Sequence, residues 1–510
     1  MVVLGMTDAK RETSMGDVKS TSYEQRASLN ENRKMLLFRL CFSAWAISAV
    51  CLAYYGYILL CARAIACYEL ALWMLPLFSY ICCTAYCAVK MKRSHLDLYC
   101  LVAIPAVTAF GLLMLPGFVP DESGHIIQAA GLFSRSANGF YVPSELASQL
   151  PIDYSEAYQT IVLPPSWTET TLTYTYYGSY SDLLYFVPGI VLKISKLLNL
   201  NVYVSLLAGR VANGLVYVAI SALLFNYLTK FKTVLFVFLM NPMLLQQEAS
   251  CSADAISNIV AIAYVVVVLE LVGKSEYKKR DALTVAALSL GLLMAKGMFA
   301  PLLLFNLLFL SRCMSDKHCL TVYSIVGLLV CGLAVLVISC YQGPFMSYSF
   351  ELMRQPLHCL KVLAKTLWEL GPFYIETYAG ASLGPLTIWV WKPWFWLYAC
   401  LQIVCLFYRD ESDGIKLGRP QSALVVIAVI VNAFLIILTQ RGWSLTVDMR
   451  EDIICGAQGR YFIPLVLPLL AVVSNKHTGQ TGGNVLLMAT VFLALIIMID
   501  FVCIVGYFAL

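Results

Sequence analysis

The chain has 510 residues, of which 60% are hydrophobic and only 13% are charged. In soluble proteins roughly a quarter of the residues are charged, whereas apolar runs of about 20 residues recur along this chain, so we expect a polytopic, all-α membrane protein. The apolar runs are continuous rather than alternating, which excludes a membrane β-barrel. The net charge of +5 is modest and gives no reason to expect a nucleic-acid partner.

The chain divides into a polar start and an apolar remainder. Residues 1–35 are too hydrophilic for a signal peptide and are expected to be a disordered cytoplasmic tail. Residues 36–97 are predicted to form a transmembrane hairpin, and residues 98–510 a transmembrane core. We expect about thirteen spanning helices. The predicted spans are 40–61, 70–89, 98–117, 203–228, 232–247, 254–272, 282–295, 298–312, 320–341, 387–408, 421–440, 461–474 and 484–508.

Two apolar stretches allow more than one interpretation. The stretch 282–312 is either a tight helical hairpin or one helix broken around Lys296. Segment 183–198 is apolar but contains Lys193 and Lys196. We interpret it as an interfacial or re-entrant helix on the outer face, with a true span as the alternative.

The positions of lysine and arginine predict the orientation. Basic residues gather in the tail and in later turns, and all of these lie on one side if residues 118–202 do not cross the membrane. Because positive loops face the cytoplasm, the N-terminus is expected inside and the C-terminus outside the cell membrane. The long external segments are then 118–202, 342–386 and 441–460.

A short polar run, from Pro120 to His125, follows a long apolar stretch. Pro120 suits the first position of a helix, and Asp121 and Glu122 would then lie in its first turn. A carboxylate here could accept a proton from a hydroxyl group. Asp121 and Glu122 together are candidate ligands for a divalent cation, Mg²⁺ or Mn²⁺. The alternative is an ordinary capped helix start.

A second polar patch joins two apolar helices between Asn241 and Asp254, and it includes Gln247. Ser252 could cap the following helix, with Asp254 in the first turn. A plain loop needs the same capping, so the pattern alone does not separate a site from a connection. An aromatic run that includes Tyr180 and Tyr185 is typical of a membrane interface, although such rings also stack on sugars.

Several cations lie inside or beside apolar runs. They are Arg210, Lys296, Arg441 and Arg460. A cation at membrane depth needs an anionic partner or a polar cavity, and arginine matches the geometry of phosphate. The alternatives are interfacial snorkelling for Arg441 and Arg460, and an ion pair of Arg210 with Asp254 or Glu248.

Five ordered motifs between roughly residues 100 and 475 resemble those of the "domain of unknown function 2142" family of predicted bacterial membrane proteins. The motifs are Pro120-Asp121-Glu122-x-x-His125, Asn241-Pro242-x-x-x-Gln246-Gln247, Ser252-x-Asp254-Ala255, Ala295-Lys296 and Gln458-Gly459-Arg460-Tyr461. The chain departs from the family at Ser123 and Ala253, where proline is common. That family is similar to the C-type (GT-C) glycosyltransferases.

The resemblance implies a GT-C-like fold and a sugar transferred from a polyprenyl-phosphate donor to a cell-envelope glycan or lipid acceptor at the outer face. Asp121 and Glu122 would be catalytic, with Asp121 as the general base. On this hypothesis, the candidate substrate-binding residues are His125, Arg210, Gln247, Asp254, Lys296, Arg441, Arg460 and Tyr461. The other classes to test are a transporter or flippase for lipid-linked glycans and a non-catalytic subunit of envelope-polymer assembly.

Overall fold

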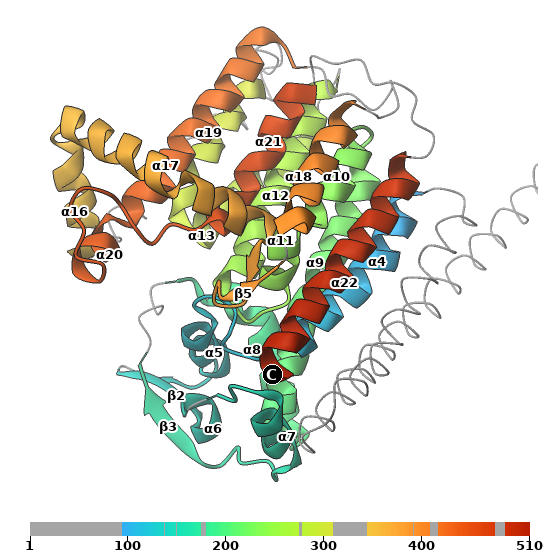
Figure 1. Cartoon of the computed structure of the whole chain (residues 1–510), viewed down its shortest axis with the longest axis vertical. Helices are drawn as coiled ribbons and strands as arrows, with labels where there is room; N and C mark the ends of the chain where they lie inside the picture. The colour runs from blue at the N-terminus through green and yellow to red at the C-terminus, as the bar shows by residue number, and fades with distance from the viewer. Residues whose placement is uncertain are drawn as a thin grey trace, which may run out of the picture.

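The computed structural model is mainly helical, with a small mixed lobe at one end (Figure 1). The residues it describes are 94–136, 138–148, 150–174, 180–274, 278–309, 344–390, 392–407, 417–474 and 485–509. The predicted tail, nearly all of the predicted hairpin and the predicted span 320–341 lie outside these residues.

Within the described residues, five helices are long and apolar enough to cross a membrane. They are α4 (His95–Leu113), α9 (Val202–Tyr227), α12 (Ala253–Gly273), α19 (Arg419–Thr439) and α22 (Val485–Ala509). Each begins and ends within a few residues of a predicted span. The chain is therefore a helical membrane protein, as its composition predicted.

Close helix packing supports the site end of the bundle. Gly214 of α9 faces α4 so closely that an added Cβ would lie 2.7 Å from the Cβ of Val107. On the other side of α4, the rings of Phe110 and Phe501 meet edge to face, with centroids 5.0 Å apart. Small residues at helix contacts allow such approach within a bilayer, where van der Waals packing drives association.

One predicted span is broken in the structure, and the stretch 282–312 separates where the sequence predicted. The segment 232–247 forms α10 (Lys232–Leu239) and α11 (Pro242–Glu248) instead of one helix. Proline cannot continue a helix because it lacks the N–H group, and Asn241 caps the new helix by accepting from the Leu244 N–H at 3.0 Å. The stretch 282–312 separates into α13 (Lys279–Ala295) and the 3₁₀ helix η2 (Gly297–Phe309), with an extended backbone at Lys296.

The segment between α4 and α9 forms the lobe at the lower end of Figure 1. Its helices are α5 (Glu122–Ala130), α6 (Ser144–Ala147), α7 (Tyr154–Val162), the 3₁₀ helix η1 (Asp182–Tyr185) and α8 (Phe186–Leu197). A three-stranded antiparallel sheet in the order β1-β2-β3 joins them. The strands are β1 (Arg135–Ser136), β2 (Gly139–Pro143) and β3 (Thr170–Thr173).

The all-α expectation is therefore wrong for this lobe. The strand β2 has a partly alternating burial pattern, with Phe140 opposite Thr173, but five residues are too few for the sequence to predict a strand. Helix α8 has 12 residues, about 18 Å at 1.5 Å per residue, which is shorter than the hydrocarbon core of a bilayer. Its length agrees with the expectation that segment 183–198 is not a spanning helix.

The C-terminal half completes the bundle. Its remaining elements are α16 (Pro344–Met353), α17 (Pro356–Ala379), β4 (Ser382–Leu383), β5 (Ile388–Trp389), α18 (Lys392–Phe407), α20 (Arg441–Thr446), the 3₁₀ helix η4 (Gly459–Phe462) and α21 (Ile463–Ser474). In Figure 1, α17 runs across the direction of α19 and α22. The predicted external segments 342–386 and 441–460 thus contain helices as well as loops.

Candidate functional site

Asp121 lies where the chain turns from the end of α4 into α5. It is the N-cap of α5, with φ +67° in the left-handed region, and its side chain does not cap the helix. The expectation that Pro120 opens the helix is therefore wrong, because the helix begins at Glu122. A non-glycine residue with positive φ is uncommon, and such strained positions cluster at functional sites.

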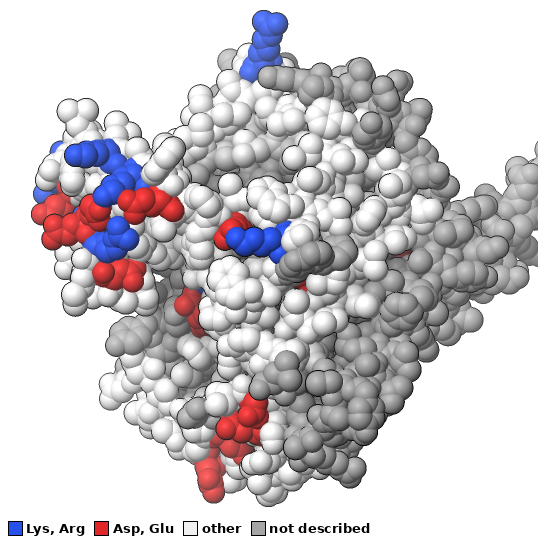
Figure 2. Space-filling model, in the orientation of Figure 1, with Lys and Arg blue, Asp and Glu red and all other residues white. Residues whose placement is uncertain are grey.

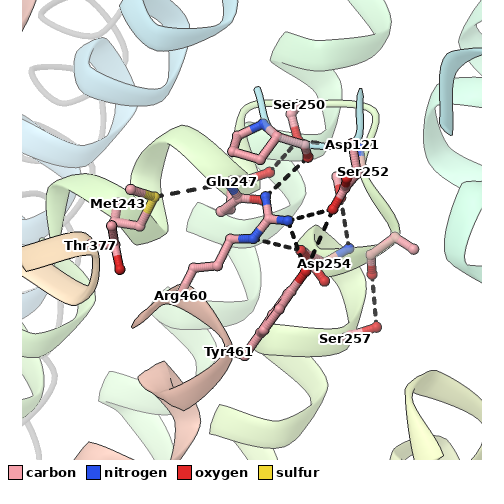
Figure 3. Close-up of polar contacts among 12 residues, drawn as sticks. Asp121, Met243, Gln247, Ser250, Ser252, Asp254, Ser257, Thr377, Arg460 and Tyr461 are labelled. Carbon is pink, nitrogen blue, oxygen red and sulfur yellow. Dashed lines mark hydrogen bonds and ion pairs between the residues drawn. The ribbon is translucent and has the colours of Figure 1, made fainter. Parts of the chain in front are cut away.

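The Asp121 carboxylate pairs with Arg460, which is 339 residues away in the chain. Oδ2 of Asp121 lies 2.6 Å from Nη2 of Arg460, and the Asp121 side chain is 39% exposed whereas that of Arg460 is 1% exposed. Arg460 also donates to the carbonyl of Pro120 at 3.0 Å and to the hydroxyl of Tyr461 at 3.0 Å. The structure thus brings together three predicted site residues (Figure 3).

Asp254 and Lys296 extend this pair into a row of alternating charges. Nε of Arg460 lies 3.6 Å from Oδ2 of Asp254, and the other oxygen of Asp254 pairs with Nζ of Lys296. Ser252 caps α12 by accepting from the Asp254 N–H at 3.1 Å, as the sequence predicted. We call Asp121, Arg460, Asp254 and Lys296 the ionic chain; it leads from a half-exposed carboxylate to buried groups.

Aromatic side chains cover the ionic chain. Nζ of Lys296 lies 5.3 Å from the ring centroids of both Tyr180 and Tyr461, which is within the range of cation–π attraction. The sequence left open whether Tyr180 belongs to a membrane interface or stacks on a sugar, and it did not place Tyr180 next to Lys296. Its place in the site depends on the fold of the lobe, which no local pattern predicts.

His125 lies beside the ionic chain as a neutral ring. Its Nδ1 lies 2.7 Å from the hydroxyl of Tyr185, and its ring is 2% exposed. Burial and the nearby Lys296 charge lower the pKa of His125 to about 3. A neutral imidazole can hydrogen-bond to a substrate or orient a carboxylate, but it does not supply a positive charge for phosphate.

Glu122 points away from Asp121 into the protein. Its Oε1 accepts from Nε of Arg210 and from the Cys251 N–H, and its Oε2 accepts from the Gly117 N–H, each at 2.9 Å. The side chains of Glu122 and Arg210 are both 0% exposed, and Arg210 also donates to two carbonyls at the end of α4. These contacts favour a structural ion pair over the predicted catalytic and substrate-binding roles.

The same contacts bear on the predicted metal site. Both oxygens of Glu122 already accept hydrogen bonds, so the pair Asp121 and Glu122 does not fit a divalent cation. In the part of the chain that the structure describes, no group of three or more His, Cys, Asp or Glu side chains could hold a metal ion. We therefore assign no chemical step to a metal.

The last two predicted binding residues have different settings. Gln247 on α11 is fully buried, and its Oε1 has no hydrogen-bond partner. Arg441 at the start of α20 donates to the carbonyls of Glu451 at 2.9 Å and Ile453 at 3.5 Å. Arg441 thus fixes the loop before η4, and these contacts do not join it to the ionic chain.

The comparisons with known proteins give one match, and it contains the residues of the site. No curated protein and no solved structure matches the chain significantly. A family model described as "Predicted membrane protein (DUF2142)" matches residues 104–469, a range that contains the whole ionic chain. Since this match covers well over half of the sequence, the chain belongs to the DUF2142 family of predicted membrane proteins, as its motifs predicted.

Proposed function

We propose that this protein is an integral-membrane glycosyltransferase that moves a sugar from a polyprenyl-phosphate donor to a cell-envelope glycan or lipid acceptor. The observation that carries the proposal is the half-exposed carboxylate of Asp121 at the head of a row of buried cations. A proton acceptor thus lies next to groups that attract phosphate. The reaction needs both: a base for the acceptor hydroxyl and positive charge for the leaving phosphate.

Each member of the site has a role in this reaction. Asp121 accepts the proton of the acceptor hydroxyl, a contribution that general bases make when they lie within hydrogen-bond reach. Arg460 and Lys296 stabilise the charge that develops on the leaving lipid phosphate. Tyr180 and Tyr461 offer ring faces on which a sugar can stack, and His125 orients a carboxylate or a sugar hydroxyl as a neutral partner.

The proposal includes a GT-C-like architecture with about thirteen spans, a cytoplasmic N-terminus and an external C-terminus. In support, the ionic chain joins residues from α12, η4 and the turn before α5, so the site lies at the lobe end of the bundle. The positive-inside rule puts that end outside the cell. A lipid-linked donor is the fitting sugar source there, because nucleotide sugars are cytoplasmic substrates.

The test uses purified protein in nanodiscs with a panel of labelled polyprenyl-phosphate sugars and a membrane extract as the source of acceptor. We expect loss of label from the donor and release of polyprenyl phosphate. Asp121→Asn should lower the rate by at least about a hundredfold, the lower range for general-base catalysis. Asp182→Asn is the matched control, because Asp182 pairs with Arg135 on the lobe surface. Normal transfer by Asp121→Asn would overturn the role of Asp121.

A transporter or flippase is the second candidate because two carboxylates are buried in the bundle. Glu248 and Asp500 are each 1% exposed, and each has an oxygen without a hydrogen-bond partner. Ionisable groups at such places often line substrate paths. The same labelled donors in liposomes separate the two functions: a flippase moves label across the bilayer without forming a new glycosidic bond.

A further inference from the structure

Helix α17 has a buried face that ties it to the site. The helix has 24 residues, about 36 Å of length. Thr377 near its end accepts from the Gly459 N–H at 2.7 Å. Gly459 fits so closely that an added Cβ would lie 2.0 Å from the carbonyl oxygen of Tyr374. The end of α17 is therefore fixed directly against the residue before Arg460.

A second face of α17 is apolar and exposed. We define the α17 stripe as the residues Leu357, Leu360, Leu367, Trp368 and Ile375, whose exposed fractions are 84%, 58%, 42%, 86% and 56%. The other four lie 3, 10, 11 and 18 residues after Leu357, and at 3.6 residues per turn these offsets place all five on one side of the helix. Such a row of large exposed hydrophobic groups marks a binding surface rather than ordinary protein exterior.

A third face of α17 is charged and largely satisfied by its own neighbours. Lys365 pairs with Glu369 at 3.6 Å and with Asp452, and Arg450 pairs with Glu369 at 3.3 Å. Figure 2 shows these opposite charges gathered over α16, α17 and α20, next to a nearly uncharged bundle surface. Since these charges neutralise one another, the charged face of α17 would attract a charged protein partner only weakly.

The orientation of α17 matches that of a helix lying in a membrane interface. It runs across the direction of the spanning helices α19 and α22 (Figure 1). It also packs against η4 and α16, and α16 packs in turn on α19 and α20. The helix α20 follows directly after α19. The α17 stripe therefore lies near the level at which α19 ends, on the same side as the site.

We propose that the α17 stripe is a bilayer-binding surface, seated in the interfacial region of the leaflet on the side of the site. The large apolar residues Ile427, Ile430 and Val431 are also exposed, on the helix α19, which is long and apolar enough to cross a membrane. Helix α16 packs against both α17 and α19 and so connects the two helices. Tryptophan favours the headgroup level, and Lys361, beside the stripe in the helical order, can extend to lipid phosphates. This lipid contact does not depend on the proposed enzymatic function.

Photo-crosslinking in nanodiscs of phosphatidylethanolamine and phosphatidylglycerol tests the proposal. The crosslinker p-benzoylphenylalanine is placed at position 357 or 368 of the stripe, at position 369 on the charged face, and at position 427 of α19 as a lipid-facing reference. We expect lipid adducts at 357 and 368 that are comparable to those at 427 and severalfold more abundant than at 369. Equal yields at 368 and 369, or protein adducts in place of lipid adducts in native membranes, would overturn the proposal.

A second measurement avoids the crosslinker. Tryptophan emission is recorded in nanodiscs with lipids brominated either near the headgroup or near the chain end. Trp368→Phe should reduce the quenching of tryptophan emission relative to the wild type. This reduction should be larger with lipids brominated near the headgroup than with lipids brominated near the chain end. If Trp368→Phe leaves quenching by both lipids unchanged, Trp368 does not contact the bilayer. Neither experiment uses enzyme activity, so its failure is separate from a failure of the proposed function.

Discussion

The buried side chain of Glu122 and the backbone conformation of Asp121 together set the direction of the Asp121 carboxylate. Asp121 adopts φ +67°, while the side chain of Glu122 accepts hydrogen bonds from three donors, two of which are buried. Because Glu122 fixes the start of α5, it also fixes the direction in which the Asp121 carboxylate leaves the backbone. The adjacent acids, which look equivalent in the sequence, therefore have different tasks: one is partly open to solvent and the other is a buried anchor.

Replacing Glu122 by Gln should destabilise the protein strongly. The change leaves the guanidinium of Arg210 buried without its counter-charge, and breaking a buried pair in this way costs about 3–5 kcal/mol. Unfolding in detergent, followed by circular dichroism, measures the loss. The matched control is Asp182→Asn, which removes a half-exposed pair with Arg135 and should cost less than about 1 kcal/mol. Equal losses for the two variants would contradict the assigned structural role of Glu122.

His125 should make stability depend on acid pH. Its pKa of about 3 in the folded protein is below the value of about 6.5 of a free histidine. Between these values the unfolded chain binds more protons, so stability should fall as pH decreases, by up to about 1.4 kcal/mol per pH unit. The slope should decrease through pH 6.5 and become negligible above about pH 7.5.

The measurement compares unfolding of the wild type and His125→Asn in detergent at pH 7 and pH 5. Asn keeps a polar group near Tyr185 but does not titrate, so the variant should lose less stability on acidification than the wild type. An identical loss in both proteins would show that His125 is not the group responsible.

At the scale of elements, the sequence predicts long helices well and short elements poorly. The apolar runs that form α9 and α22 are recognisable from their length alone, because a spanning helix needs about 20 apolar residues. The break between α10 and α11 depends on Pro242, a local signal that hydropathy alone ignores. The strands of the lobe are two to five residues long, and their pairing is a long-range property that no local pattern contains.

The contact between α17 and η4 gives a prediction at the same scale. In Gly459→Ala, the new methyl group would collide with the backbone of Tyr374 and Tyr378, so helix and turn must separate. Overpacking of this kind costs about 1–3 kcal/mol, and it should also displace Arg460 and reduce sugar transfer.

The control for this change is Gly371→Ala within α17. No atom lies within 4 Å of the Cβ that it would add, and alanine is the better helix former by about 1 kcal/mol. Its melting temperature should be equal to or above that of the wild type. A Gly459→Ala variant as stable and active as Gly371→Ala would mean that the tight contact is unimportant.

At the scale of the whole molecule, the sequence motifs contain the charged residues of the ionic chain but do not predict how these residues pair. Motifs identified Asp121, Asp254, Lys296 and Arg460, and the structure joins them in the ionic chain. Arg210 has a similar sequence setting, inside an apolar run, but it pairs with Glu122 instead. Which buried cation meets which acid depends on helix rotation and depth, and these are settled by packing that acts over the whole bundle.

The ionic chain contains two carboxylates and two cations, so its charges balance one another. In the proposed reaction, a phosphate-bearing donor brings an additional negative charge close to Asp121, and a nearby negative charge disfavours the ionised form of a carboxylate. When the acceptor oxygen bonds to the anomeric carbon, its proton passes to Asp121, and the electron pair of the broken bond between sugar and phosphate leaves with the lipid phosphate. Arrival of the donor would then make Asp121 more basic, which predicts an ordered reaction in which the acceptor is activated only after the donor has bound.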